Sequence, residues 1–195
     1  MKPIALEETL SLADYERVRP RLRPLFIHEK ERRRLAVGAH LTLLFENAQT
    51  VWYQVHEMIR VEKITSREAI QHELDTYNEL IPGPGELSAT LLIEYADIAE
   101  RDIALRRLIG LERHLWIVLI GERLPVKFDE RQVSAEQVSA VQFVKFPLGG
   151  TRPERFQEIA ARGEVAIEAD HPSLAARAVI TGPIGAALTE DLFQS

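Results

Sequence analysis

The sequence contains no cysteine, and this absence removes several kinds of chemistry at once. A chain without thiols forms no disulfide, offers no thiolate nucleophile and cannot build an ordinary cysteine-ligated iron–sulfur cluster. Long apolar runs are also missing, because no segment approaches the ~20 residues of a membrane span and the N-terminus lacks a signal-peptide pattern. We therefore expect a cytoplasmic protein that does not enter a membrane and carries no redox centre of its own.

The short motifs that mark common active sites are absent as well. There is no GxxxxGK phosphate loop, no GxSxG nucleophile elbow and no HExxH pair of zinc ligands. We accordingly expect no cofactor and no metal, and we leave open whether the chain is an enzyme. The weaker alternative is a metal site assembled from neighbours on two consecutive helices, namely His56, Glu57, His72 and Glu73.

Charge is distributed unevenly along the chain. Residues 17–34 hold eight basic and two acidic side chains, although the whole chain has a net charge of −6. We favour solvated faces of two N-terminal helices broken at Pro20 and Pro24, with long arginine stems covering apolar surface. The alternative is a docking surface for an acidic partner, with contacts from Arg32, Arg33 and Arg34. Nucleic-acid binding is disfavoured, because the chain is acidic overall and no aromatic residues interleave with these arginines.

The hydrophobic pattern predicts a single domain of the α+β class. It indicates strands within 35–46, 87–95, 114–120, 124–128, 138–146 and 165–169, and helices at 9–33, from Asn47 or Thr50, 66–80, 99–109, from Ser134, 153–162 and between Pro172 and Phe193. A tight hairpin at Gly121 and Glu122 argues against a purely parallel sheet. We predict one mixed, largely antiparallel sheet of five or six strands with helices packed on it. Residues 1–34 would form a helical arm, 35–150 the sheet core and 151–195 a C-terminal extension.

A row of polar residues supplies a candidate site. Gln54, Glu57 and Arg60 recur at i, i+3 and i+6, so one side of their helix would present them together. A sheet that brought the following loops to this helix would form a cleft with acid, base and anion-binding groups. The candidates on these segments are Asn47, Gln54, Glu57, Arg60, Tyr77, Asn78, Glu86, Asp129, Arg131 and Gln132.

Two interpretations of this row stay open. In an enzyme, Glu57 would act as general acid or base, Arg60 would orient an anionic substrate, and Tyr77 or Asn78 would supply hydrogen bonds. The plainer interpretation, which we favour, is that Glu57 and Arg60 form an ordinary surface pair and that Asn78 caps a helix end.

Four segments resemble a bacterial family described as domain of unknown function 3501. They are RRRLAVGAHLTLLFEN, QVHEMIRVE, YNELIPGPGELSATLLIE and FDERQVSAEQVSAVQFVKFPL, and the likeness covers about residues 5 to 193. The resemblance emphasises Asn47, Gln54, Glu57, Arg60, Tyr77, Asn78, Pro82, Glu86 and Thr90. His56 departs from the family pattern, in which that position is usually Gln, and this weakens the metal alternative.

The resemblance carries no mechanism, because no activity is established for the family. Its members are often encoded beside rubrerythrin-like proteins and iron–sulfur oxidoreductases. This association implies an accessory or binding partner of a redox or oxidative-stress system, and the missing cysteines favour that role over electron carriage. An enzyme of unassigned class is the alternative, and self-association into a homo-oligomer is left open.

Overall fold

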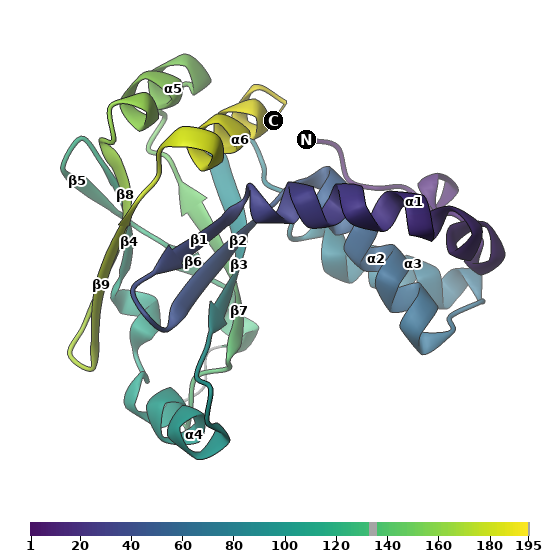
Figure 1. The fold of residues 1–195 in the computed structure, drawn as a ribbon, viewed down its shortest axis with the longest axis horizontal. Helices are drawn as coiled ribbons and strands as arrows, with labels where there is room; N and C mark the ends of the chain where they lie inside the picture. Colours follow the sequence, from purple (N-terminus) through teal and green to yellow (C-terminus); the bar gives the residue numbers. More distant parts are fainter. Residues whose placement is uncertain (133–135, 195) are drawn as a thin grey trace.

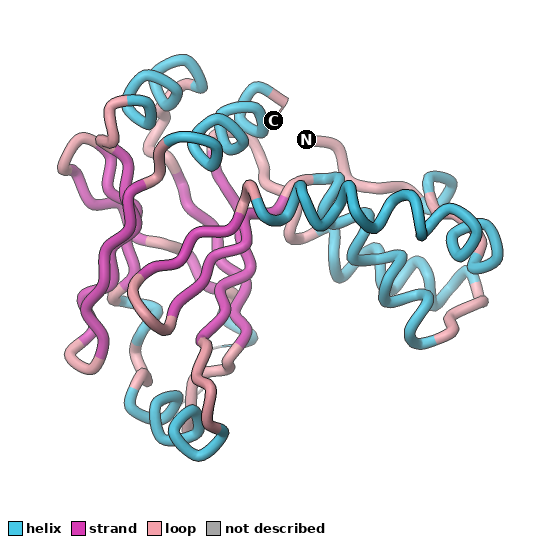
Figure 2. Tube along the Cα trace, in the orientation of Figure 1, coloured by secondary structure: helices cyan, strands magenta, loops and turns pink. Residues whose placement is uncertain are grey.

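The computed structural model describes residues 1–132 and 136–194, which form two facing β-sheets and a separate helical lobe (Figure 1). Figure 2 shows the strands gathered on one side and the helices of the lobe projecting from the other. The lobe consists of α1 (Leu12–Glu31), α2 (Ala48–Glu62) and α3 (Arg67–Asn78). The predicted α+β class is confirmed, but the strands form two sheets instead of one.

Every strand pairing in the described part of the chain is antiparallel. The first sheet has the order β1 (Arg34–Val37), β2 (Leu41–Glu46), β3 (Glu86–Ile93), β7 (Val141–Pro147) and β6 (Lys127–Phe128). The second has the order β5 (Glu122–Pro125), β4 (Leu115–Leu119), β8 (Val165–His171) and β9 (Leu174–Val179). Because β9 contacts β1 and β5 runs on into β6, the two sheets approach each other at both edges.

Alternation along the strands places apolar side chains between the sheets. Leu41, Leu43 and Phe45 of β2 point inward and join the main core, whereas Thr42 and Glu46 lie on the other face. A second core lies inside the helical lobe and includes Val51, Val55 and Ile59 of α2. Phe143 on the outer face of β7 packs against this second core. The lobe is therefore seated on the outside of the first sheet.

Further helices lie at the two ends of the paired sheets (Figure 1). α4 (Ile98–Arg107) lies at one end, and α5 (Pro153–Ala161) and α6 (Gly182–Phe193) pack against each other at the other end. Short 3-10 helices occur at Leu6–Glu8, Leu111–Arg113 and Glu130–Gln132. The short helix expected from Ser134 falls on residues outside the described part of the chain.

The predicted break of the first helix at its prolines is wrong, since α1 runs continuously through Pro20 and Pro24. Each proline removes one backbone hydrogen bond of the helix, because it has no N–H to donate. Both prolines lie on the exposed side of α1, where water can reach the carbonyls left without a donor. Ser11 caps the helix by accepting from the Asp14 N–H, and Arg19 ties its middle to α2. Contacts outside the helix thus offset the lost hydrogen bonds.

Two turn predictions need correction. The segment expected as one buried strand near residues 37–45 is the β1–β2 hairpin, which reverses at Gly38 with a φ of +69°. The β4–β5 turn uses Ile120 and Gly121, one residue earlier than predicted, with φ values of 53° and 83°. Positive φ at both central residues is what a type I′ hairpin turn requires. Ser66 caps α3 by accepting from the Ala69 N–H.

The C-terminal prediction missed a strand. Residues 174–179 read LAARAV and were expected within a helix, because alanine and arginine favour helices. They form β9, which pairs with β8 along its whole length and leaves one terminal helix, α6. Since β8 also pairs with β4, the segment expected as an extension completes the second sheet.

We predict that Gly38 is needed for the contact between the two sheet edges. A Cβ at Gly38 would lie 2.8 Å from the Cβ of Ala176 in β9. Gly85 has nearly the same φ, +71°, but no atom within 4 Å of an added Cβ. Both Gly→Ala variants should therefore lose about 1 kcal/mol through backbone strain, and Gly38→Ala about 1–3 kcal/mol more through the clash. Urea unfolding measures both, and equal losses would contradict the close approach.

Candidate functional site

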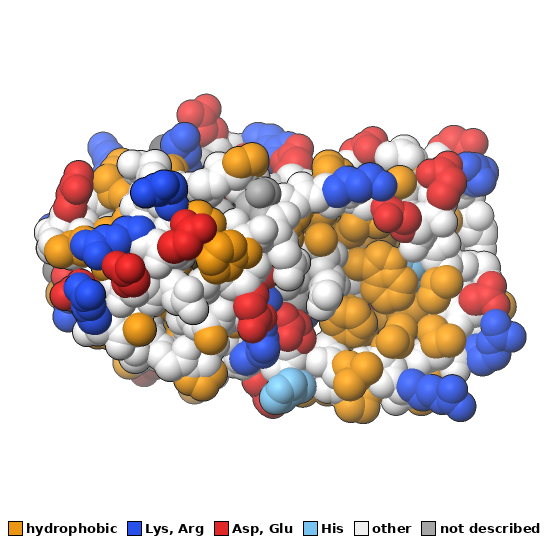
Figure 3. Space-filling model, turned by 90° about the horizontal axis from the view of Figure 1, so that it is seen from above, with side chains coloured by type: hydrophobic (Ala, Val, Ile, Leu, Met, Phe, Trp, Pro, Cys, Tyr) orange, Lys and Arg blue, Asp and Glu red, His pale blue; other side chains and the backbone are white. Residues whose placement is uncertain are grey.

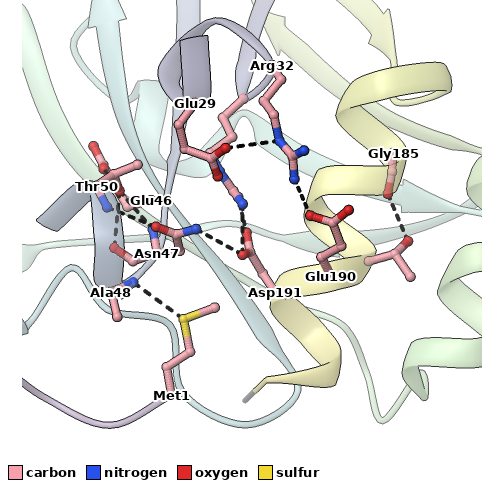
Figure 4. Close-up of polar contacts among 12 residues, drawn as sticks. Met1, Glu29, Arg32, Glu46, Asn47, Ala48, Thr50, Gly185, Glu190 and Asp191 are labelled. Carbon is pink, nitrogen blue, oxygen red and sulfur yellow. Dashed lines mark hydrogen bonds and ion pairs between the residues drawn. The ribbon is translucent and has the colours of Figure 1, made fainter. Parts of the chain in front are cut away.

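A buried ion pair joins the helical lobe to the C-terminal helix (Figure 4). The side chains of Arg33, just after α1, and Asp191, in α6, are each only 2% exposed. Arg33 donates to Asp191 through Nη1 and through Nη2, the latter at 3.0 Å, and its Nε donates to Glu29 at 2.6 Å. Burial alone would lower the pKa of Arg33, but the hydrogen bonds and charges of Asp191 and Glu29 raise it. The guanidinium therefore stays charged inside the protein.

Asn47 has a structural place in the same cluster. Its Nδ2 donates to Asp191 at 3.1 Å, and its Oδ1 caps α2 by accepting from the Thr50 N–H at 2.9 Å. The neighbouring Glu46 accepts from the hydroxyls of Thr50 and Thr90 at 2.5 and 2.8 Å. These side chains connect the first strands, α2 and α6, and Asn47 itself is only 5% exposed.

Glu57 lies at the centre of a second polar cluster, between α1 and α2. Arg19 donates to both carboxylate oxygens at 2.7 and 3.0 Å, and the buried Tyr15 hydroxyl donates at 2.8 Å. The expected pair with Arg60 also forms, at 3.3 Å, but Arg19 is the closer partner. The hydrogen bond from Arg19 lowers the pKa of Glu57 to about 2. At neutral pH this carboxylate has no proton to donate, and it is a weak base.

Tyr77 and Asn78 are engaged elsewhere. Asn78 accepts from the Ile4 N–H and donates to the Ile4 carbonyl, both at 2.9 Å, so it clamps the N-terminal segment instead of capping a helix. Tyr77 packs against the core of the lobe. Its pKa is raised, chiefly by burial, although a hydrogen bond with Gln54 opposes part of this shift. Among the described residues, no hydrogen bond joins this pair to Glu57 or Arg60. The four catalytic candidates therefore do not share one hydrogen-bonded site.

The loops expected to converge make two separate sets of polar contacts. Arg131, after the β4–β5 hairpin, forms ion pairs with Asp129 at 2.7 Å and with Glu79 at the end of α3. Gln132 accepts from the Phe143 N–H at 2.8 Å. Glu86 accepts from Lys145 at 2.8 Å and from the Gly83 N–H at 3.0 Å. These groups fasten the loops to one another, which explains their polarity without a ligand.

The arginine-rich segment is used mainly within the chain. Arg32 pairs with Glu29 at 3.2 Å and with Glu190, and Arg34 pairs with Glu94 at 3.2 Å. The expectation that Arg33 contacts a partner is wrong, because that side chain is buried. Sequence periodicity could not reveal this, since its carboxylate partner lies 158 residues away.

His56 has two backbone partners. Its Nε2 accepts from the Leu10 N–H at 2.9 Å, and its Nδ1 lies 2.8 Å from the Trp52 carbonyl. Burial lowers the pKa of His56. Over the described residues no group of three or more His, Asp or Glu side chains is arranged to hold a metal ion. Nor is any helix there long and apolar enough to cross a membrane.

Sequence reasoning missed an aromatic surface on the lobe. Phe26 of α1 stacks on Tyr53 and Trp52 of α2, with ring centroids 4.5 and 6.1 Å apart. Together with the N-terminal segment, the rings of Phe26 and Trp52 line a groove of about 300 Å³. We call its apolar lining the Trp52 face, formed by Pro3, Ile4, Phe26, Ala48 and Trp52. Figure 3 shows hydrophobic side chains gathered on this side of the lobe, with charged side chains around them.

These observations define an α+β protein with two facing antiparallel sheets, an appended helical lobe and an exposed aromatic groove. The family model of a protein of unknown function (DUF3501) matches residues 3–192, and the chain belongs to this family. It is similar to a crystal structure of a novel protein of unknown function from Burkholderia pseudomallei K96243. The two are 36% identical with a TM-score of 0.88, over 98% of this chain and 100% of that one. Comparison with curated proteins finds no match.

We predict strong coupling between Arg33 and Asp191. Either Arg33→Met or Asp191→Leu leaves a buried charge without its partner, and each should cost about 3–5 kcal/mol of unfolding free energy. The double variant removes both charges and should lose much less than the sum of the two. Urea unfolding of the three variants measures this coupling. Additive losses would show that the two side chains stabilise the fold independently.

The pKa of Glu57 predicts an acid limb of stability. Its pKa falls from an ordinary 4.5 to about 2 on folding, so its stabilisation is complete above pH 4.5 and is lost as the pH falls toward 2. By linkage this amounts to at most about 3 kcal/mol. Glu57→Gln should be less stable at pH 7 and should lose less stability across that interval. Unfolding midpoints at a series of pH values test this, and parallel curves would contradict it.

Proposed function

We propose that this chain is an accessory protein without catalytic activity that binds a protein partner through the Trp52 face. The observation that carries the proposal is an aromatic groove that opens at the surface of the lobe, on a side where charged side chains surround the apolar ones (Figure 3). Apolar patches rimmed by polar residues mark interaction surfaces, and aromatic side chains dominate binding energy at such surfaces.

The groove is held in shape before any partner arrives. The Trp52 indole N–H donates to the Glu8 carbonyl at 3.0 Å, and its ring lies 3.8 Å from that of His56. Phe26 is fixed between Trp52 and Tyr53 by stacking. Side chains that are already ordered lose little conformational entropy on binding, which favours affinity. Lys2, Glu8 and Gln49 supply the polar rim that protein interfaces require.

The arrangement of the polar candidates supports an accessory role over an enzyme. Glu57 is neutralised by Arg19, and Asn78 is committed to the N-terminal segment. Hydrogen bonds from the lobe also hold the N-terminal segment beside the groove. Asn78 binds Ile4, which lines the groove, and His56 binds Leu10. These residues then serve to position the Trp52 face.

The class of partner comes from the family resemblance and not from the geometry. The resemblance implies that members of the family are often encoded beside rubrerythrin-like and iron–sulfur proteins, and this association favours a partner from a redox or oxidative-stress system. The chain would bind such a protein without carrying electrons, in keeping with its lack of cysteine.

Affinity purification from native cell lysate at low salt tests this function. Tagged wild-type protein should retain an iron–sulfur or di-iron protein in near-stoichiometric amount. Trp52→Ala and Pro3→Glu should each weaken the affinity for the partner by about 30-fold, the effect of losing ~2 kcal/mol at the centre of an interface, and recovery should fall accordingly. Trp52→Ala alters the packing, so Pro3→Glu, at an exposed position, provides the second variant.

Val61→Glu is the matched control, because Val61 is an apolar residue of α2 that is 61% exposed and does not line the groove. It should retain the partner fully. If the wild-type protein retains no redox protein, the proposed class of partner is wrong. Equal recovery by all variants would remove the Trp52 face as the binding surface.

A further inference from the structure

α4 lies at the end of the sheets away from α5 and α6 (Figure 1). A second cavity lies beside α4 and has a volume of about 480 Å³. One face of α4 forms its wall through Glu100, Ile103, Ala104 and Arg107. Their spacing of i, i+3, i+4 and i+7 is that of a single helical face. Tyr95, Leu108 and Ser173 complete the lining. The volume falls within the range of small-molecule sites, about 300–1,000 Å³.

The middle of this cavity is apolar. Leu108 is 1% exposed and belongs to the main core. Ile103 is 52% exposed and lies three residues after Glu100 and four residues before Arg107. The ring of Tyr95 is held by His40, whose ring stacks on it at 3.9 Å with an interplanar angle of 8°. His40 is itself held at the Glu94 carbonyl, 3.1 Å from its Nδ1. An apolar ligand body placed here would cover Ile103 against an ordered aromatic ring.

The ends of the cavity carry opposite charges. Arg107 has no carboxylate within 4 Å among the described residues, unlike Arg101 and Arg113, which pair with neighbouring acids. A guanidinium in this position matches a carboxylate in charge and geometry. Glu100 lies seven residues earlier, about 10 Å along the helix axis, and opposes a second negative charge at that end. The hydroxyls of Tyr95 and Ser173 add hydrogen-bonding groups across from α4.

We propose that this cavity binds a small amphipathic monocarboxylate, with the carboxylate on Arg107 and the apolar chain along Ile103, Ala104 and Leu108. The site is separate from the Trp52 face, because the two linings share no residue. The chain would then bind a small carboxylate at one end of the sheets and a protein partner on its helical lobe.

An NMR titration of the isotope-labelled full chain tests the proposal with octanoate as the probe. Saturable shifts are expected at residues 95, 103–108 and 173, with a Kd on the order of 1 mM for a ligand of this size. Octanamide should bind about tenfold more weakly, because it keeps the apolar chain but lacks the negative charge that pairs with Arg107. Shifts confined to the Trp52 face, or no saturable shift at all, would overturn the proposal.

Arg107→Gln should weaken octanoate binding by about tenfold, the effect of losing one charge-assisted contact. Arg106→Gln is the matched control, because Arg106 is the adjacent arginine of α4 and lines a different cavity. It should bind octanoate like the wild type. Ile103→Ser should weaken binding several-fold by removing apolar contact. Equal effects of the two arginine variants would show nonspecific attraction to a basic helix and would overturn the site.

Discussion

The buried ion pair between Arg33 and Asp191 is the contact on which the arrangement of this protein depends. It joins the end of α1 and the start of β1 to α6, and through Asn47 it reaches the first turn of α2. Such a pair adds little to the free energy of folding compared with apolar side chains packed in its place. Removing one partner, however, leaves an unpaired charge in a low-dielectric interior. We infer that its main effect is specificity, because other packings of the lobe would leave one of these charges unpaired.

The helical lobe is stabilised by polar contacts that sequence reasoning could take for an active site. Glu57, Tyr15 and Arg19 connect α1 to α2, while Asn78 and His56 hold the N-terminal segment against the same helices. Each of these five polar side chains has a partner within the chain. The half-buried rings of Phe26 and Trp52 lie beside these contacts and stack on each other. The same polar residues therefore help to set the shape of the groove.

The sheets and the lobe have different functional consequences. The interior between the sheets is filled with apolar side chains and offers rigidity, and openings occur at the ends and surfaces, where helices meet strands. α4 contributes a face with separated charges to one of these openings, whereas α1 and α2 contribute aromatic rings to another. These two openings therefore offer chemically different surfaces, as the proposed partner site and the proposed carboxylate site require.

Local sequence determined the features that depend on near neighbours. Asn47 and Ser66 begin helices through their own side chains. The β4–β5 hairpin was predictable from sequence but its exact turn was not, because the β-branched Ile120 takes a φ of 53°, which its own side chain disfavours. The family membership and the α+β class were also predictable from sequence. Tertiary structure alone decided that LAARAV becomes β9, that α1 continues through Pro20 and Pro24, and that Glu57 pairs chiefly with Arg19. These outcomes depend on partners outside each segment, such as Glu168, 9 residues from Arg177, and Glu57, 38 residues from Arg19. The energy of such contacts exceeds local propensities of tenths of a kcal/mol.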